Sequence, residues 1–343
     1  MIMKMQMNHP CEELLHAMSQ KNLVYNHDFL LFSHADYSVS PVAYGVPDGW
    51  LYSDGSSGSI NWEDNHLVIV TSNDDKTKMT FKQNLHEFPR WQNVLANQRV
   101  TARIHMNVSA DCLVALSLTD GNNANYEAKY LKANHHMVLD VQFKVGNNPE
   151  KLTLAIESEA NAATIAISRV YANIGHMALP NLPCMVEGVI GQTKQYLGTE
   201  NAPANELSLC QVAVELNADQ TRLDTVLNGR FGEGANERSL LPDLRGYFLR
   251  AWDNGAEIDP NAKTRFALGQ GSGNTGDHVG TWQEDLFKEH HHSIPFEKAT
   301  LKPSGDSAPV HPVDDLQETP TSDVGGDETR PKNVYTLYTI KWS

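Results

Sequence analysis

Strict alternation of apolar and polar residues over long stretches is the feature that most restricts how this chain can fold. The apolar positions are Val100, Ala102, Ile104, Met106 and Val108 in one run and Met137, Leu139, Val141, Phe143 and Val145 in another. Successive side chains of a β-strand point to opposite faces of a sheet. Each run therefore predicts a strand with one buried face and one solvated face.

The same period continues through much of the first half of the chain. Turn clusters rich in Asn, Asp, Gly and Ser separate further strand-like runs at residues 67–71, 112–118, 152–156 and 164–171. Several strands at this spacing, with no helical pattern between them, predict a β-sandwich. We therefore expect a mainly β fold, in which residues 21–177 form a jelly-roll sandwich and residues 1–20 a short helical segment.

Composition excludes several classes of protein. A formal net charge of −15 over 343 residues argues against nucleic acid as a partner, because binding to the phosphate backbone needs clustered Lys and Arg. The four cysteines lie far apart and form no CxxC pair, so neither a disulfide scaffold nor a zinc finger is indicated. No stretch reaches the roughly 18 uninterrupted apolar residues of a membrane span, and no signal peptide is recognisable. We expect synthesis in the cytoplasm.

The texture of the sequence changes near residue 178. Two prolines and three glycines fall within residues 175–191, which indicates a linker at residues 178–190. Beyond it, Asn217 is a candidate helix cap, with Gly229 just past the end of the helix. Apolar residues in an extended run close to residue 343 predict a strand that is tied into the fold. These residues are Val334, Leu337 and Ile340.

Four stretches in the second half resemble the tail-collar domain and tip of phage tail fibres. They are RFGEG at 230–234, LPDLRG at 241–246, GTWQEDLFKEHHH at 280–292 and GGDETRPKNV at 325–334. The resemblance implies a tail-collar domain at residues 191–285 and an intertwined, trimeric, loop-rich β tip at residues 286–343. One departure lies before Cys210, where Glu206 and Leu207 replace the tryptophan that is usual in the family.

Three adjacent histidines lie in the expected tip. Tail fibres of this family are trimers whose His-x-His pairs hold metal ions on the axis, and the resemblance gives this role to His290 and His292. In an extended strand these two side chains share one face, and three copies would supply six imidazoles to an octahedral transition metal. The resemblance favours iron, with zinc as the second choice, as a structural ion coupled to folding. The alternative is a solvated histidine run in a loop.

Aromatic residues give the expected sandwich a candidate ligand surface. Residues 22–32, followed by PDGW at 47–50, resemble the opening of jelly-roll domains found in phage tail proteins and carbohydrate-binding modules. The candidates for stacking on sugar rings are Trp50, Tyr52, Trp62 and Trp91. The alternative is that these side chains belong to the core, as aromatic residues of a sandwich commonly do.

No pair of carboxylates lies in a recognisable catalytic frame, and we expect no enzymatic activity. Asp253, Glu257 and Asp259 are close enough in sequence for a glycosidase pair or a calcium loop. The resemblance instead makes residues 252–259 a structural loop.

The resemblance implies a receptor-binding tail fibre, which is an adhesin of a phage or a phage-like contractile particle. It would be a homotrimer located in the tail, attached to the baseplate or other tail proteins. Its recognition surface would lie in the loops between His292 and Arg330, and its receptor would be a cell-surface glycan or an outer-membrane protein. The alternatives are a polysaccharide-degrading tail spike and a free-standing trimeric lectin.

Overall fold

The computed structural model describes residues 20–36, 39–73, 78–268, 272–286 and 332–343. The chain divides into one unit of residues 1–282 with 336–343 and a second unit of residues 283–335. The helical segment expected over residues 1–20 falls almost entirely outside the described residues, and so do His290 and His292. The fold that follows is that of the first unit.

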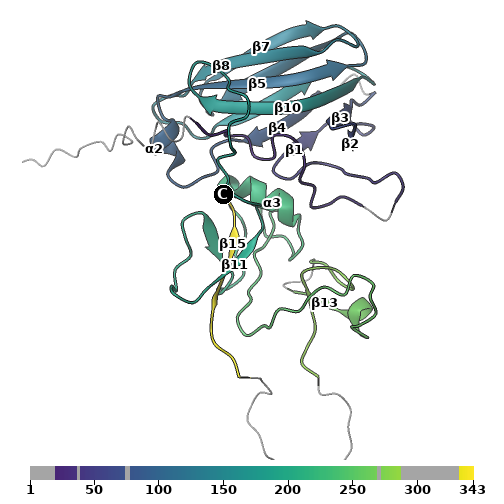
Figure 1. The fold of residues 1–343 in the computed structure, drawn as a ribbon, viewed down its shortest axis with the longest axis vertical. Coiled ribbons are helices and arrows are strands. Elements are labelled where there is room, and N and C mark those ends of the chain that lie inside the picture. Colours follow the sequence, from purple (N-terminus) through teal and green to yellow (C-terminus); the bar gives the residue numbers. More distant parts are fainter. Residues whose placement is uncertain (1–19, 37–38, 74–77, 269–271, 287–331) are drawn as a thin grey trace, which may run out of the picture. The chain divides into compact units, whose positions relative to one another are not determined.

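Two five-stranded antiparallel sheets form the sandwich that the alternating sequence predicts (Figure 1). The first sheet has the order β1 (Leu51–Ser53), β4 (Met79–Asn84), β9 (Thr153–Ser158), β6 (Cys112–Thr119) and β7 (Ala124–Leu131). The second has the order β2 (Ser59–Glu63), β3 (His66–Val70), β10 (Thr164–Ile174), β5 (Arg99–Val108) and β8 (Met137–Lys144). Apart from the hairpins β2–β3 and β6–β7, strands that follow one another, such as β7 and β8, belong to opposite sheets, as in a jelly roll.

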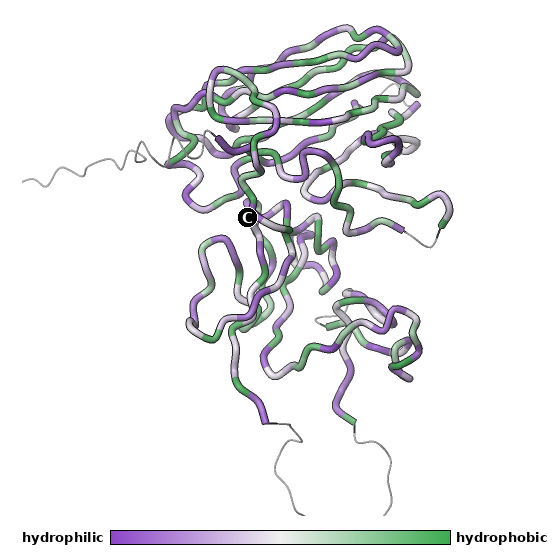
Figure 2. Tube along the Cα trace, in the orientation of Figure 1, coloured by the Kyte–Doolittle hydropathy of each residue, from purple (hydrophilic) through white to green (hydrophobic). Residues whose placement is uncertain are grey.

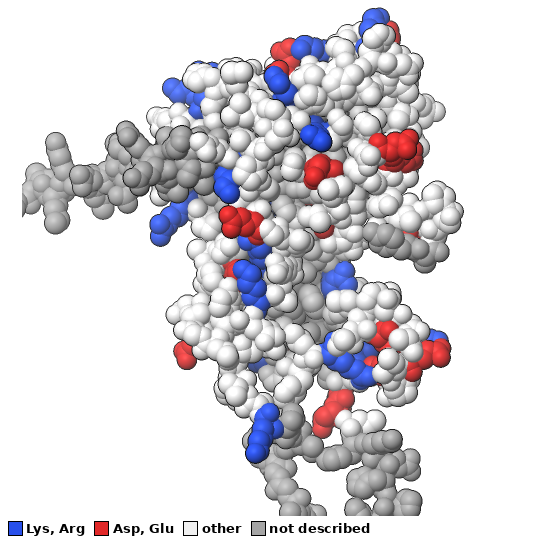
Figure 3. Space-filling model, viewed as in Figure 1, with Lys and Arg blue, Asp and Glu red and all other residues white. Residues whose placement is uncertain are grey.

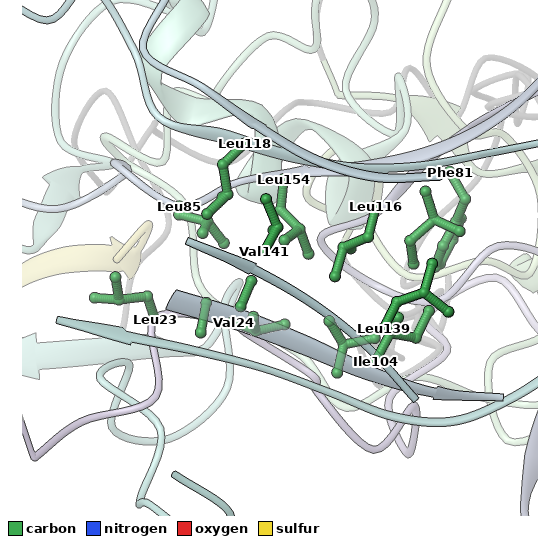
Figure 4. Close-up of a cluster of buried hydrophobic side chains, with 14 of the residues drawn as sticks. Leu23, Val24, Phe81, Leu85, Ile104, Leu116, Leu118, Leu139, Val141 and Leu154 are labelled. Atoms are coloured by element: carbon green, nitrogen blue, oxygen red, sulfur yellow. The ribbon is translucent and has the colours of Figure 1, made fainter. Parts of the chain in front are cut away.

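The core lies between the two sheets. Hydropathy alternates along the strands (Figure 2), and the apolar members point inward. Figure 4 shows side chains from both sheets meeting there, among them Ile104 and Leu139 from the second sheet and Leu116, Leu118 and Leu154 from the first. All five are completely buried. Burial of one such side chain contributes roughly 1.5–3 kcal/mol, so this packing fixes the register of the strands.

A smaller region follows the sandwich and has its own core. Its sheet has the order β11 (Thr193–Tyr196), β15 (Leu337–Lys341) and β12 (Glu206–Ser208), so the strand expected near residue 343 is confirmed and is central. A second pair is formed by β13 (Phe266–Ala267) and β14 (Thr281–Trp282). Short helices complete the described elements: α2 (Trp91–Leu95), η1 (Ala218–Gln220), α3 (Thr221–Leu227) and η2 (Ala262–Thr264).

The helix expected after Asn217 is confirmed together with its cap. The Asn217 side chain accepts a hydrogen bond from the backbone N–H of Asp219 at 2.9 Å, and the Gln220 side chain accepts one from the N–H of Asn217 at 3.0 Å. This reciprocal capping box satisfies N–H groups at the start of η1, which leads into α3. Asn228 ends α3 in a left-handed conformation, one residue before the expected Gly229.

Residues 178–190, predicted as a linker, make hydrogen bonds to the first strand-like segment of the sandwich. The backbone N–H of Asn22 donates to the carbonyl of Pro183 at 2.8 Å, and the N–H of Met185 donates to the carbonyl of Asn22 at 2.9 Å. The Tyr25 hydroxyl accepts from the N–H of Ile190 at 3.1 Å. The sandwich and the region after it are therefore bonded to one another along this stretch.

A buried charged side chain completes that contact. Arg222 of α3 has no exposed surface and donates hydrogen bonds to the carbonyls of Leu23, Asn84 and Glu87 at 3.2, 2.8 and 3.4 Å. The buried Glu87 carboxylate accepts from the N–H groups of Thr221 and Arg222 at 3.1 and 2.8 Å. Burial raises the pKa of Glu87 above its usual range.

Candidate functional site

The expected sugar-stacking role of Trp50 and Trp91 is corrected by their positions. Trp50 is completely buried, and its ring stacks on that of Phe81 with centroids 4.3 Å apart. Trp91 begins α2, is 9% exposed, and packs against the His86 ring at 4.8 Å. Both side chains fill the core because they bring large apolar area between the sheets. Neither leaves a ring face open to a sugar.

Tyr52 and Trp62 are half-buried and also pack against the core. The Tyr52 hydroxyl donates to the Asp54 carboxylate at 3.2 Å, and burial together with that carboxylate raises the pKa of Tyr52. The Trp62 ring lies 6.1 Å from that of Phe32. The four predicted aromatic residues therefore do not form one open surface.

Two other tyrosines do point outward from the sandwich. Tyr126 and Tyr130 lie on β7 and are 68% and 61% exposed. They share one face of the strand because they are four residues apart. Their cross-strand partners on β6 are Ser117 and Leu113, and the residues on either side of each partner along β6 are buried. The two tyrosines therefore stand on the outer face of the first sheet.

The space between the two rings is lined by small side chains. Ala128 lies between them on β7 and pairs with Ala115 of β6, while Ser117 pairs with Ala155 of β9. Residues four apart in a strand are separated by about 13 Å. The two aromatic rings and the small side chains between them form a surface that we call the Tyr126–Tyr130 face.

Polar groups border this face. Glu157 pairs with Ala115 across β9 and β6, and its carboxylate lies 3.0 Å from the Lys78 ammonium. At the other end, the Lys132 ammonium lies 5.3 Å from the centroid of the Tyr130 ring. Flat rings beside hydrogen-bonding groups can hold a ligand that has both apolar C–H faces and hydroxyls.

The edge strand itself is held by its inward side chains. Asn125 and Lys129 donate to the carbonyls of Gln142 and Val138 on β8, at 2.7 and 3.4 Å. These bonds join the edges of the two sheets and hold the face that carries the tyrosines. Sequence reasoning missed β7 because its inward positions are polar. The signal it left is NYEAKY, with two tyrosines and an alanine at every second position.

The carboxylates of the 252–259 loop hold the loop itself. Asp253 accepts hydrogen bonds from the backbone N–H groups of Glu257, Ile258 and Asp259 at 2.8 to 2.9 Å, and these bonds lower the pKa of Asp253. Asp259 is 6% exposed and pairs with two arginines. This arrangement matches the expected structural loop.

The distribution of surface charge, possible metal ligands and apolar helices does not point to another functional site among the described residues. Figure 3 shows acidic and basic side chains interspersed on the face in view. Among the described residues, no group of three or more His, Cys, Asp or Glu side chains is placed to hold a metal ion. Within the same residues, no helix has the length and apolar content needed to cross a membrane.

The described fold defines a mainly β protein with an antiparallel sandwich and an open aromatic face. Its sequence is 32% identical to protein RhiB of Rhizobium leguminosarum bv. viciae over 169 residues, which are 47% of this chain and 75% of RhiB. The chain therefore belongs to the same family as RhiB. No family model matches it.

Several solved structures match part of the chain at low similarity. TmCBM61 in complex with β-1,4-galactotriose is 12% identical, with 45% of this chain and 99% of that chain covered and a TM-score of 0.33. The CBM22-1 xylan-binding domain of Paenibacillus barcinonensis Xyn10C is 16% identical, with 38% and 89% covered and a TM-score of 0.29. The enzymatically active domain of bacteriophage CBA120 tailspike protein 4 is 10% identical, with 45% and 21% covered and a TM-score of 0.32. Matches this distant do not indicate a ligand.

Proposed function

We propose that this protein is a non-catalytic, glycan-binding adhesin that acts as a homotrimer. The observation that carries the proposal is the Tyr126–Tyr130 face, where two tyrosine rings remain more than half exposed. Large apolar rings that stay outside a core commonly belong to a binding surface. The small side chains between them leave room for a ligand to lie flat.

The geometry favours an oligosaccharide over a single sugar. Because the two tyrosines are about 13 Å apart along β7, one monosaccharide ring cannot cover both. A glycan chain lying along the strand can place C–H faces on each ring and hydroxyls near Glu157 and Ser117. A protein partner would need a larger and better-filled apolar surface than two rings, Leu113 and three alanines provide.

The test is binding of the full chain to soluble neutral polysaccharides and to their oligosaccharides, measured by calorimetry. Replacing Tyr126 or Tyr130 by alanine should weaken binding roughly 3- to 10-fold, and replacing both should weaken it more, because each ring contributes about 0.5–1.5 kcal/mol by stacking. Tyr335→Ala is the matched control, since that tyrosine is 97% exposed and lies outside the sandwich. Unchanged affinity in the double variant, or binding only to proteins, would overturn the proposal.

The trimer is proposed from a different observation. The region after the sandwich leaves large apolar side chains exposed, including Leu197 at 81%, Val212 at 68% and Phe248 at 62%. Exposed apolar side chains in such numbers are typical of surfaces that associate. We propose that two further copies of the chain cover them, as the resemblance to tail fibres implies. Light scattering should give a mass of three chains, and Phe248→Ser should reduce it. A monomer in the unaltered protein would contradict this part.

The proposal extends to the particle and the metal only through the sequence resemblance. His290 and His292, which lie outside the described residues, would hold a structural transition metal shared by three chains. Elemental analysis of the purified trimer should find iron or zinc, which His290→Ala with His292→Ala removes. The particle would be a phage or a phage-like contractile particle. Cleavage of a bound polysaccharide, read as loss of viscosity, would instead support the degrading tail spike.

A further inference from the structure

A pocket far in sequence from the sandwich lies within residues 250–281. It is lined by residues 250–253 and 277–281 together with Asp259 and Arg265. Trp252 is half-exposed here, and its indole N–H donates to the carbonyl of Asp277 at 3.1 Å. The ring is therefore held at the pocket by its edge while a face remains open.

The frame of the pocket is fixed by the chain's own bonds. The Arg265 guanidinium donates to the Asp259 carboxylate, to the Thr281 hydroxyl and to the Thr281 carbonyl, each at 3.0 Å. The Asp277 carboxylate accepts from the N–H of Gly255 at 2.8 Å. These bonds use one N–H donor on each of the three guanidinium nitrogens and hold Arg265 in the frame of the pocket, where its side chain is only 17% exposed.

Arg250 differs from Arg265 in this respect. Its nearest partner among the described residues is Asp259, at 3.4 Å, and Asp259 already has Arg265 at 3.0 Å. The Arg250 side chain is 48% exposed. A guanidinium carries five N–H donors in a planar fork that fits a carboxylate. Arg250 therefore has donors to offer at the pocket that also contains the open Trp252 ring.

We propose that this pocket binds a saccharide unit that carries a carboxylate, such as a hexuronic acid within a glycan. Its ring would lie on Trp252 and its carboxylate would accept from Arg250. The pocket is also lined by Asp253 and Asp277, so selection of the acidic sugar comes from the spare donors of Arg250 and not from net charge. The inference rests on the proposed function in that both sites take glycans, and it adds a second site outside the sandwich.

The test uses the full chain with Tyr126 and Tyr130 both changed to alanine, so that the sandwich face is silent. Binding of oligosaccharides of hexuronic acid is compared with that of neutral oligosaccharides of the same length, by calorimetry and by saturation-transfer NMR. The acidic ligand should still bind. Arg250→Gln and Trp252→Ala should each reduce its affinity about tenfold or more, whereas Trp252→Phe should keep most of it.

Several outcomes would overturn the inference. Equal binding of the neutral and acidic ligands would remove the role of Arg250, and acidic binding unchanged by Arg250→Gln would do the same. If the hexuronic acid oligosaccharide did not bind to the Tyr126/Tyr130 double variant, the pocket would not be a saccharide site. A failure of the proposed sandwich site would be seen separately, because the unaltered chain would then not bind neutral oligosaccharides.

Discussion

Replacing Arg222 by methionine tests whether a buried guanidinium holds the sandwich and the region after it together. Methionine keeps much of the length of the side chain but leaves the carbonyls of Leu23, Asn84 and Glu87 without their donor. It also removes a positive charge whose electrostatic interaction with the buried Glu87 carboxylate favours the ionised form of that group. The change should therefore destabilise the folded chain strongly.

The expected size follows from this geometry. Losing the donor to three carbonyls and the favourable electrostatic interaction with the buried Glu87 carboxylate should together cost about 3–5 kcal/mol. At 2–4 °C per kcal/mol for a domain of moderate size, the loss corresponds to a fall in Tm of roughly 6–20 °C. Changing Glu87 to glutamine in the same chain removes the stranded charge. The double variant should recover a large part of the loss.

Chemical denaturation of the four forms, followed by fluorescence, gives the coupling free energy between the two residues. Arg103→Met is the matched control, because Arg103 pairs with Asp140 on an exposed surface, where such pairs contribute at most about 1 kcal/mol. The reasoning is refuted if Arg222→Met lies within 1 kcal/mol of the unaltered chain, or if the double variant is no more stable than the single one.

Three further predictions concern the fold. Burial lowers the pKa of His86 below its ordinary 6.5, so the stability contributed by the neutral imidazole should be complete above that pH and be lost as the pH falls through the folded-state pKa. The Tm should therefore fall less on acidification in His86→Gln than in the unaltered chain, and an equal fall in both would contradict this. Trp50→Ala should cost about 3–5 kcal/mol in denaturation because it empties a fully buried site, and a loss near zero would mean that the ring is not in the core. Asn217→Ala should cost about 1 kcal/mol through loss of the helix cap, whereas Asn217→Asp should keep most of it, and equal losses would exclude capping.

The sequence identified the strands whose two faces differ most. β5 and β8 were predicted within a residue or so of their ends, because one face of each is buried and the other is solvated. β7 was missed, since its inward Asn125 and Lys129 bond to the neighbouring sheet edge and do not enter the core. In this edge strand the less polar members of the alternation, Tyr126, Ala128 and Tyr130, face outward, so the pattern does not mark a face that enters the core.

The candidate site was harder to predict than the fold. Trp50 and Tyr126 are both aromatic residues in strand-rich sequence, and only contacts distant in sequence separate them. Trp50 is buried because Phe81 lies against it, 31 positions further along the chain. Tyr126 is exposed because its cross-strand partner on β6 is Ser117, whose side chain is on the outer face of the sheet. Such cross-strand partners cannot be predicted from local propensity. The cap at Asn217 depends on residues adjacent in sequence and was predicted.

The central position of β15 in its sheet has a consequence for synthesis. β12 ends at Ser208 and β15 begins at Leu337, so about 130 residues separate neighbouring strands. At 5–20 residues per second, a ribosome needs roughly 6–26 s to add them. During that interval the edges of β11 and β12 have no strand between them, and the nascent chain must avoid pairing with others until β15 is released.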